Sequence, residues 1–134
     1  MIVNVEGLGV ILVDHGSKFQ AANDMLIDVA ADFGAATGVA IVEPAHMEIA
    51  EPTLAQAFAR CVERGAKRIV VVPYFLAPGR HSTSDIPRMT SEAAAPFPDV
   101  PFSVAQPLGV DRRISEIMAG HVVRALNEQA QHDE

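Results

Sequence analysis

The sequence predicts an α/β domain with a four-stranded parallel sheet flanked by helices, and three observations lead to this prediction. Short, continuous apolar runs alternate along the chain with longer stretches in which apolar residues recur at helical spacing. The order of these segments is βαβαβαβα, which is typical of parallel strands joined by right-handed crossovers. The 134 residues contain no linker, repeat or low-complexity segment, so we expect residues 1–134 to form a single domain with one core.

The first strand and the first helix have the clearest signals. Residues 8–14, LGVILVD, form a continuous apolar run, as expected of a strand that is buried on both faces. Ser17 can cap the helix that follows, and Gly34 and Gly38 bracket its end. The apolar stripe of this helix consists of Phe19, Ala22, Leu26, Val29, Ala30 and Phe33.

The middle of the chain repeats the pattern. Residues 39–48, VAIVEPAHME, predict a second strand, and Pro52 then stands where the first turn of a helix tolerates a proline. Gly65 ends this helix. Residues 68–75, RIVVVPYF, predict the third strand, and the loop LAPGRHSTSD follows it.

The last part of the chain predicts a helix, a strand and a final helix. The short helix covers about residues 85–95, and the strand covers residues 100–106, VPFSVAQ. The stripe of the final helix consists of Ile114, Ile117, Met118, Val122, Ala125 and Leu126. The polar tail from about residue 127 is expected to fray.

Composition narrows the range of partners. The formal net charge is −7, aromatic residues make up 5% of the chain and tryptophan is absent, which argues against nucleic acids and anionic membranes as partners. We find no signal peptide and no apolar run long enough to span a bilayer. The single cysteine, Cys61, excludes a disulfide within the chain. We therefore expect a cytoplasmic protein.

Three histidines and one carboxylate are expected to meet at one edge of the sheet. His15 ends the first strand, His46 and Glu48 lie at the end of the second, and His81 lies in the loop after the third. The carboxyl ends of parallel strands share an edge, where ligands bind. Two imidazoles and a carboxylate suit a first-row divalent metal, and imidazoles can also accept protons near neutral pH. The alternative is that each histidine only caps a helix.

Hydroxyl and basic groups surround the same loops, and Arg80 and Arg88 could pair with carboxylates of a ligand. In the alternative interpretation Arg88 is a solvated helix residue and the Ser/Thr run is an N-cap. The candidate substrate-binding residues are Ser17, Arg80, Ser82, Thr83 and Arg88.

Phosphate chemistry is a competing use of the first loop, because a Gly-Ser turn that opens a helix can bind an anion. The chain lacks a glycine-rich fingerprint and the lysine spacing of a nucleotide-binding loop. Phosphotransfer through His15 is disfavoured because Asp14, which precedes it, would repel a phosphoryl group.

Three segments of the chain stand out together: ILVDHGSK…AAN (11–23), AHMEIAEPTLAQAF (45–58) and RIVVVPYFLAPGRHSTSDIP (68–87). They resemble the signature regions of the small-type sirohydrochlorin chelatases, the class II cobaltochelatases and ferrochelatases of cobalamin and sirohaem biosynthesis. The resemblance implies a chelatase-like fold and ATP-independent insertion of Co²⁺ or Fe²⁺ into sirohydrochlorin. It also implies that the metal is a substrate and that no cofactor is tightly bound.

The resemblance assigns roles to residues of this chain. The two active-site histidines of the family fall on His15 and His81, and a family glutamate falls on Glu48, so these three are the implied catalytic and metal-binding residues. Two positions depart from the family: Asp14 stands where glycine is usual, and His46 stands where an apolar or aromatic residue is usual. We expect His46 to point towards the cleft, either lining the substrate wall, which we favour, or as a third imidazole near the metal.

Larger relatives in this family carry two such units that face each other across a cleft. A chain of this length has one unit, so the resemblance implies a homodimer. Three alternatives stay open at this point: insertion of Ni²⁺, another tetrapyrrole as substrate, and a non-catalytic carrier that binds tetrapyrrole or metal on the same fold.

Overall fold

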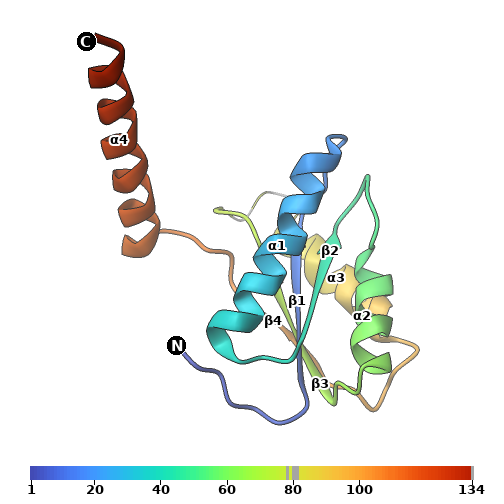
Figure 1. Ribbon diagram of the computed structural model, residues 1–134. Coiled ribbons are helices and arrows are strands. Elements are labelled where there is room, and N and C mark those ends of the chain that lie inside the picture. Colours follow the sequence, from blue (N-terminus) through green and yellow to red (C-terminus); the bar gives the residue numbers. More distant parts are fainter. Residues whose placement is uncertain (78, 80–81, 134) are drawn as a thin grey trace.

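The computed structural model describes residues 1–77, 79 and 82–133. Four strands form one parallel sheet in the order β2-β1-β3-β4 (Figure 1). The α/β class, the βαβαβαβα order and the four-stranded parallel sheet are confirmed. In chain order the elements are β1 (Leu8–Asp14), α1 (Gln20–Thr37), β2 (Ile41–His46), α2 (Leu54–Glu63), β3 (Arg68–Pro73), α3 (Ser82–Ala94), β4 (Phe102–Val104) and α4 (Arg112–Asp133).

Strand β1 occupies the interior of the sheet, which explains its continuous apolar sequence. Residues 10–13 are all buried, because β1 has a strand on each side and helices on both faces. Strand β2 lies at the edge, where Pro44 can be accommodated because one side of the strand needs no hydrogen-bonding partner.

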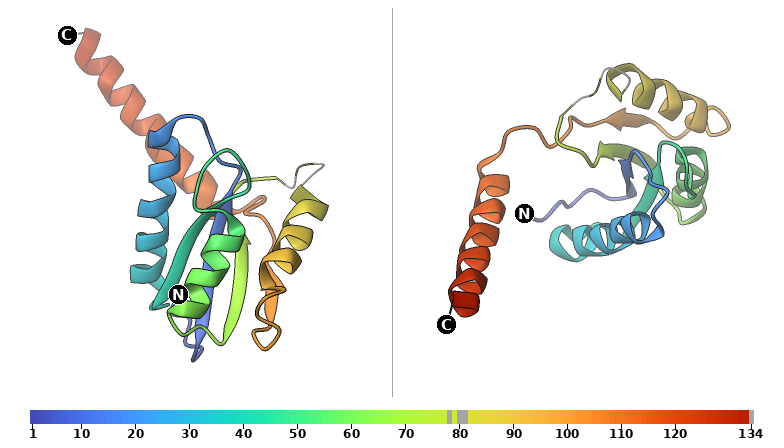
Figure 2. Two further views of the ribbon diagram at one scale, coloured as in Figure 1. Left: turned by 90° about the vertical axis from the view of Figure 1, so that its right-hand side faces the viewer. Right: turned by 90° about the horizontal axis from the view of Figure 1, so that it is seen from above.

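Two apolar clusters lie on opposite faces of the sheet. The larger cluster joins α2 and α3 to alternate residues of the central strands, such as Ile11, Val13 and Val71. The smaller cluster joins Leu26 and Ala30 of α1 to the strand residues that point to the other face, such as Val10 and Leu12. Figure 2 shows α1 on one side of the sheet and α2 and α3 on the other.

Several element boundaries differ from the predictions. Strand β2 is shorter than predicted and ends at His46, and β4 has only three residues. The N-cap of α1 is Phe19, without a side-chain cap, so Ser17 does not cap the helix as predicted. Helix α2 begins with a capping box between Thr53 and Gln56.

Helix α4 differs most from its prediction. Residues from 127 onwards were expected to fray, but α4 continues to Asp133. It makes no extensive contact with the other described helices and strands, and it stands apart from them in Figures 1 and 2. Among the described residues, the sheet is therefore flanked by α1, α2 and α3. No described helix is long and apolar enough to cross a membrane.

Candidate functional site

The loops that follow β1 and β2 are joined by main-chain hydrogen bonds. The amide of Met47 donates to the carbonyl oxygen of Asp14 at 2.8 Å, and the amide of Glu48 donates to that of His15 at 3.2 Å. The side chains of His15 and Glu48 are both exposed. These bonds confirm that His15 and Glu48 lie on adjoining loops at the carboxyl edge of the sheet.

Gly16 is required for this close approach. Its φ angle is +88°, and a Cβ atom at this position would lie 2.0 Å from the carbonyl oxygen of Glu48. Any other residue would therefore combine a left-handed backbone with a clash against main chain. The glycine lets the loop that carries His15 lie directly on the loop that carries Glu48.

Asn23, on α1, holds the loop that follows β1 in place. Its side chain is buried, donates to the carbonyl oxygen of Ser17 at 2.8 Å and accepts from the amide of Ser17 at 2.9 Å. The hydroxyl of Ser17 in turn accepts from the amide of Phe19 at 3.0 Å. Our sequence reasoning missed Asn23, although a polar residue beside the apolar stripe of a helix signals a buried partner.

The ring of His15 stacks on Phe75, which lies just beyond β3. The ring centroids are 4.8 Å apart and the planes meet at 25°. Phe75 is half-buried, so it gives the exposed imidazole a fixed apolar support on one face. The edges of the imidazole, which carry its nitrogen atoms, are the parts that can take a metal or a proton.

His46 does not point into an open cleft. Its side chain is 2% exposed, and its Nδ1 atom lies 2.5 Å from Oδ1 of Asp14, which also accepts a hydrogen bond from the amide of Gly16. The prediction that His46 lines the substrate wall is therefore wrong. It assumed that β2 continued to Glu48, but the strand ends at His46, so side-chain alternation no longer places the two residues on one face; His46 is buried and Glu48 is exposed.

Of the remaining predicted site residues, some lie on α3 and others lie outside the described residues. His81 and Arg80 lie outside the described residues, and Ser82 and Thr83 are in the first turn of α3. Arg88 forms ion pairs on the surface of α3 with Asp85 and Glu92, at 3.6 and 3.0 Å. This placement fits the alternative interpretation of Arg88, a solvated helix residue.

Within the described ranges, no group of three histidine, cysteine, aspartate or glutamate residues lies close enough to hold a metal ion. The predicted set of His15, Glu48 and His81 includes a residue outside those ranges. Of that predicted set, the described part of the chain contains the exposed imidazole of His15 and the exposed carboxylate of Glu48, which lie on adjoining loops.

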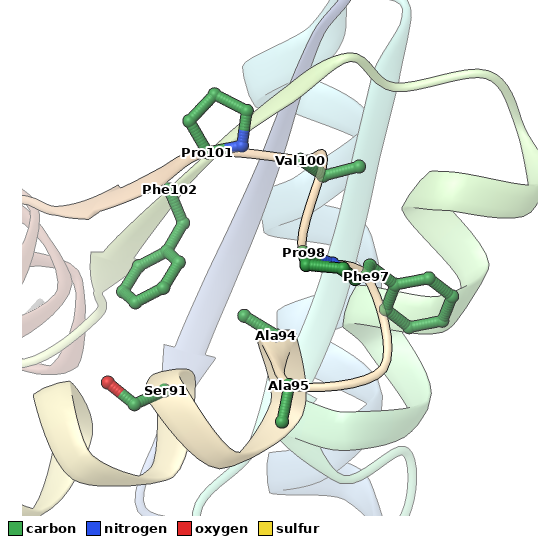
Figure 3. A pocket seen from close by; sticks show the side chains of 8 residues that line it. All are labelled: Ser91, Ala94, Ala95, Phe97, Pro98, Val100, Pro101 and Phe102. Carbon is green, nitrogen blue, oxygen red and sulfur yellow. The ribbon is translucent and has the colours of Figure 1, made fainter.

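A hollow between the end of α3 and the start of β4 lies at the opposite edge of the sheet (Figure 3). Ser91 has the only polar side chain among the 8 residues that line it. The side chains that line this hollow include no acid, base or metal ligand.

A family model described as CbiX matches residues 9–125. The chain belongs to the CbiX family. It is 44% identical over 119 residues to the chloroplastic sirohydrochlorin ferrochelatase of Arabidopsis thaliana, covering 89% of this chain and 53% of that protein. It is 35% identical over 120 residues to the sirohydrochlorin cobaltochelatase of Sulfolobus acidocaldarius, covering 90% and 94%. The chain spans about half the length of the first relatives that it matches.

Solved structures of CbiX-like proteins have the same fold. A CbiX protein from Marinobacter aquaeolei VT8 superposes with a TM-score of 0.78 at 28% identity, covering 92% of this chain and 98% of that one. SirB from Bacillus subtilis with Fe³⁺ gives a TM-score of 0.75 at 30% identity, covering 81% and 43%. The family therefore includes chains of this length and chains about twice as long.

Proposed function

We propose that this chain inserts a divalent metal, Co²⁺ or Fe²⁺, into sirohydrochlorin without ATP. The observation that carries the proposal is the juxtaposition of an exposed His15 and an exposed Glu48 at the carboxyl edge of a CbiX-family sheet. The choice of substrate and of the two metals is supported by the relatives, which include sirohydrochlorin ferrochelatases and cobaltochelatases.

The chemistry follows from what metallation requires. Two pyrrole N–H protons must leave the macrocycle, and a partly dehydrated metal must reach its nitrogen atoms. The imidazole of His15 can bind the metal or accept a proton, and Phe75 restricts the ring orientation. The carboxylate of Glu48 attracts the cation to the same edge. Holding metal and macrocycle together removes the entropic cost of their encounter.

Other groups complete the proposal. His81 is the second catalytic histidine, and Arg80 binds carboxylates of the substrate, which a chain of net charge −7 would otherwise repel. Ser17, Ser82 and Thr83 offer hydroxyl groups to the same carboxylates. Arg88 contributes least, because its guanidinium is already paired on α3.

The substrate needs a second wall, and we propose that a second copy of the chain provides it. One sheet edge covers one face of a flat macrocycle, and the Arabidopsis and Bacillus relatives are about twice as long as the matched region. We propose the cytoplasm as the location on the basis of the sequence; the Arabidopsis relative is chloroplastic.

The test is an anaerobic insertion assay with sirohydrochlorin and Co²⁺, Fe²⁺ or Ni²⁺, followed by the change in tetrapyrrole absorbance. We expect turnover with Co²⁺ or Fe²⁺ and severe loss in His15→Ala and in His81→Ala. His132→Ala, which alters an exposed histidine of α4, is the matched control and should keep full activity. Tight binding of tetrapyrrole without turnover would overturn the proposal in favour of a carrier, and faster turnover with Ni²⁺ would overturn the choice of metal.

A further inference from the structure

The loop after β2 contains a strained residue, Ile49. Its φ angle is +75°, and among the described residues it is the only one other than glycine with a positive φ. The amide of Ala50 donates to the carbonyl oxygen of Glu48 at 2.8 Å. A hydrogen bond that spans a single residue of positive φ closes a γ-turn of the rare, strained kind. A β-branched side chain at its centre adds to the strain, because the substituents on Cβ crowd the main chain.

Folding alone does not account for an isoleucine at the centre of this turn. The side chain of Ile49 is 61% exposed, and it belongs to neither of the two apolar clusters that the described residues form. Glycine would adopt the same backbone without strain, and asparagine tolerates it better than a β-branched residue does. Strained residues of this kind are concentrated at functional sites. The strain and the exposure of Ile49 together point to a role outside folding.

Ile49 lies at the edge that carries the candidate site. It directly follows Glu48, whose amide donates to the carbonyl oxygen of His15 at 3.2 Å. The carbonyl oxygen of Glu48, which closes the γ-turn, is also the atom that a Cβ at Gly16 would approach to 2.0 Å. The turn therefore packs against the loop that carries His15.

The loop that contains the turn is anchored on both sides of Ile49. Before it, the amide of Met47 donates to the carbonyl oxygen of Asp14 at 2.8 Å. After it, the carbonyl oxygen of Pro52 accepts a hydrogen bond from the amide of His46 at 2.9 Å. A short loop held in this way fixes the backbone of Ile49, so the side chain loses little freedom when it contacts a ligand.

The neighbouring loops also carry exposed apolar side chains. Phe19, in the loop after β1, is 78% exposed, and Leu76, in the loop after β3, is 58% exposed. Leu76 directly follows Phe75, which supports the ring of His15. The loops after β1, β2 and β3 therefore each combine an exposed apolar side chain with a residue of the site or its support. A ligand with an apolar face and a polar rim fits this combination.

We infer that Ile49 contacts the face of the tetrapyrrole macrocycle and sets how tightly the substrate is held. Sirohydrochlorin has an apolar ring face and carboxylates around its rim, so the ring face needs an apolar contact beside the groups that handle metal and protons. Burial of an exposed isoleucine against the ring would supply affinity through the hydrophobic effect. The inference rests on the proposed function for the identity of the macrocycle. Ile49 is a specificity-determining residue and takes no part in proton transfer or metal binding.

The first test measures binding of the macrocycle without metal. Sirohydrochlorin is titrated anaerobically into the metal-free protein, and Kd is obtained from the change in absorbance. Ile49→Asn keeps a residue that tolerates the turn but removes the apolar side chain, whereas Ile49→Leu keeps an apolar side chain of the same size. We expect Kd to rise at least about tenfold in Ile49→Asn and to stay within about threefold of the wild type in Ile49→Leu. Ile27→Asn, at a 54% exposed position on α1, is the matched control and should leave Kd unchanged.

The second test separates contact with the ring from support of the fold. Because asparagine accepts a left-handed backbone more readily than isoleucine, Ile49→Asn should unfold at the same urea concentration as the wild type or at a higher one. Stability and substrate affinity should therefore not fall together. In the insertion assay, the KM for sirohydrochlorin should rise at least about tenfold in Ile49→Asn while kcat changes less than about threefold.

Three outcomes would overturn the inference. They are an unchanged Kd in Ile49→Asn, an equal rise of Kd in Ile27→Asn, and a fall in urea midpoint that accompanies the loss of affinity. The proposed function fails in a different way. A wild type that binds sirohydrochlorin but inserts no metal would overturn metal insertion, and the titration would still decide the role of Ile49. A wild type that does not bind sirohydrochlorin would overturn both.

Discussion

Replacing His46 with phenylalanine tests whether the buried pair with Asp14 stabilises the edge that carries the site. The change removes the imidazole that contacts Oδ1 of Asp14 at 2.5 Å. A hydrogen bond to a charged group contributes about 1.5–3 kcal/mol net. Asp14 is 22% exposed and keeps the amide of Gly16 as a donor, so its carboxylate is not left fully unsatisfied.

Packing adds to this loss. His46 is 2% exposed, and fitting a larger ring into such a site costs about 1–3 kcal/mol when neighbours must shift. We therefore expect His46→Phe to lower the free energy of unfolding by about 2.5–6 kcal/mol, the sum of the two effects. His132→Phe, at an exposed position on α4, should change it by less than about 0.5 kcal/mol.

A double-mutant cycle separates the pair from the packing. The free energies of unfolding of the wild type, Asp14→Asn, His46→Phe and the double variant are measured by urea denaturation at one protein concentration, because the proposed pairing of chains would make stability concentration-dependent. We expect a coupling energy of about 1.5–3 kcal/mol between the two positions. A coupling below about 0.5 kcal/mol would refute the view that the contact stabilises this edge.

Three further predictions follow from contacts at the site and in the core. Gly16→Ala should destabilise the fold by at least about 2 kcal/mol in urea denaturation, because its Cβ would meet the carbonyl oxygen of Glu48 in a left-handed backbone; an unchanged midpoint would contradict this. Phe75→Leu should lower turnover up to about tenfold with little change in stability, because it removes the stacking partner of His15; unchanged kcat would show that the stack is not needed. Burial raises the pKa of the Cys61 thiol to about 12, so a thiol reagent at mildly alkaline pH should label it only in denaturant. Rapid labelling of the native protein would refute the burial argument. Because the pKa of Cys61 is higher in the folded than in the unfolded chain, the buried neutral thiol contributes to the free energy of unfolding below the unfolded pKa, and this contribution is lost as the pH rises towards 12.

The central part of the fold could be predicted from sequence because burial on both faces leaves a direct signal. The predicted bounds of β1, residues 8–14, agree with the structure, since a seven-residue apolar run bounded by a glycine and a charged residue is short enough to favour a buried strand over a helix. The meeting of His15 and Glu48 followed from the parallel order alone, because parallel strands end at one edge.

The direction of His46 could not be predicted in the same way. Alternation of side chains holds only within a strand, and the amides of Met47 and Glu48 bond to the loop after β1 instead of extending β2. The position of α4 relative to the sheet could not be predicted from the sequence either. Helical periodicity indicates that a face will be buried, but it does not indicate which sheet will bury it.

The main-chain bonds between the first two loops make the spacing of His15 and Glu48 a property of strand register. In the proposed role as a cation site, this edge would be preorganised: it would lose little backbone freedom on binding, and only side-chain rotation could adapt it to an ion of another radius. Substitutions in the distant core that slide β2 along β1 would alter that spacing without touching either residue. Selection for packing between these two strands is thus also selection for the geometry of the reactive edge.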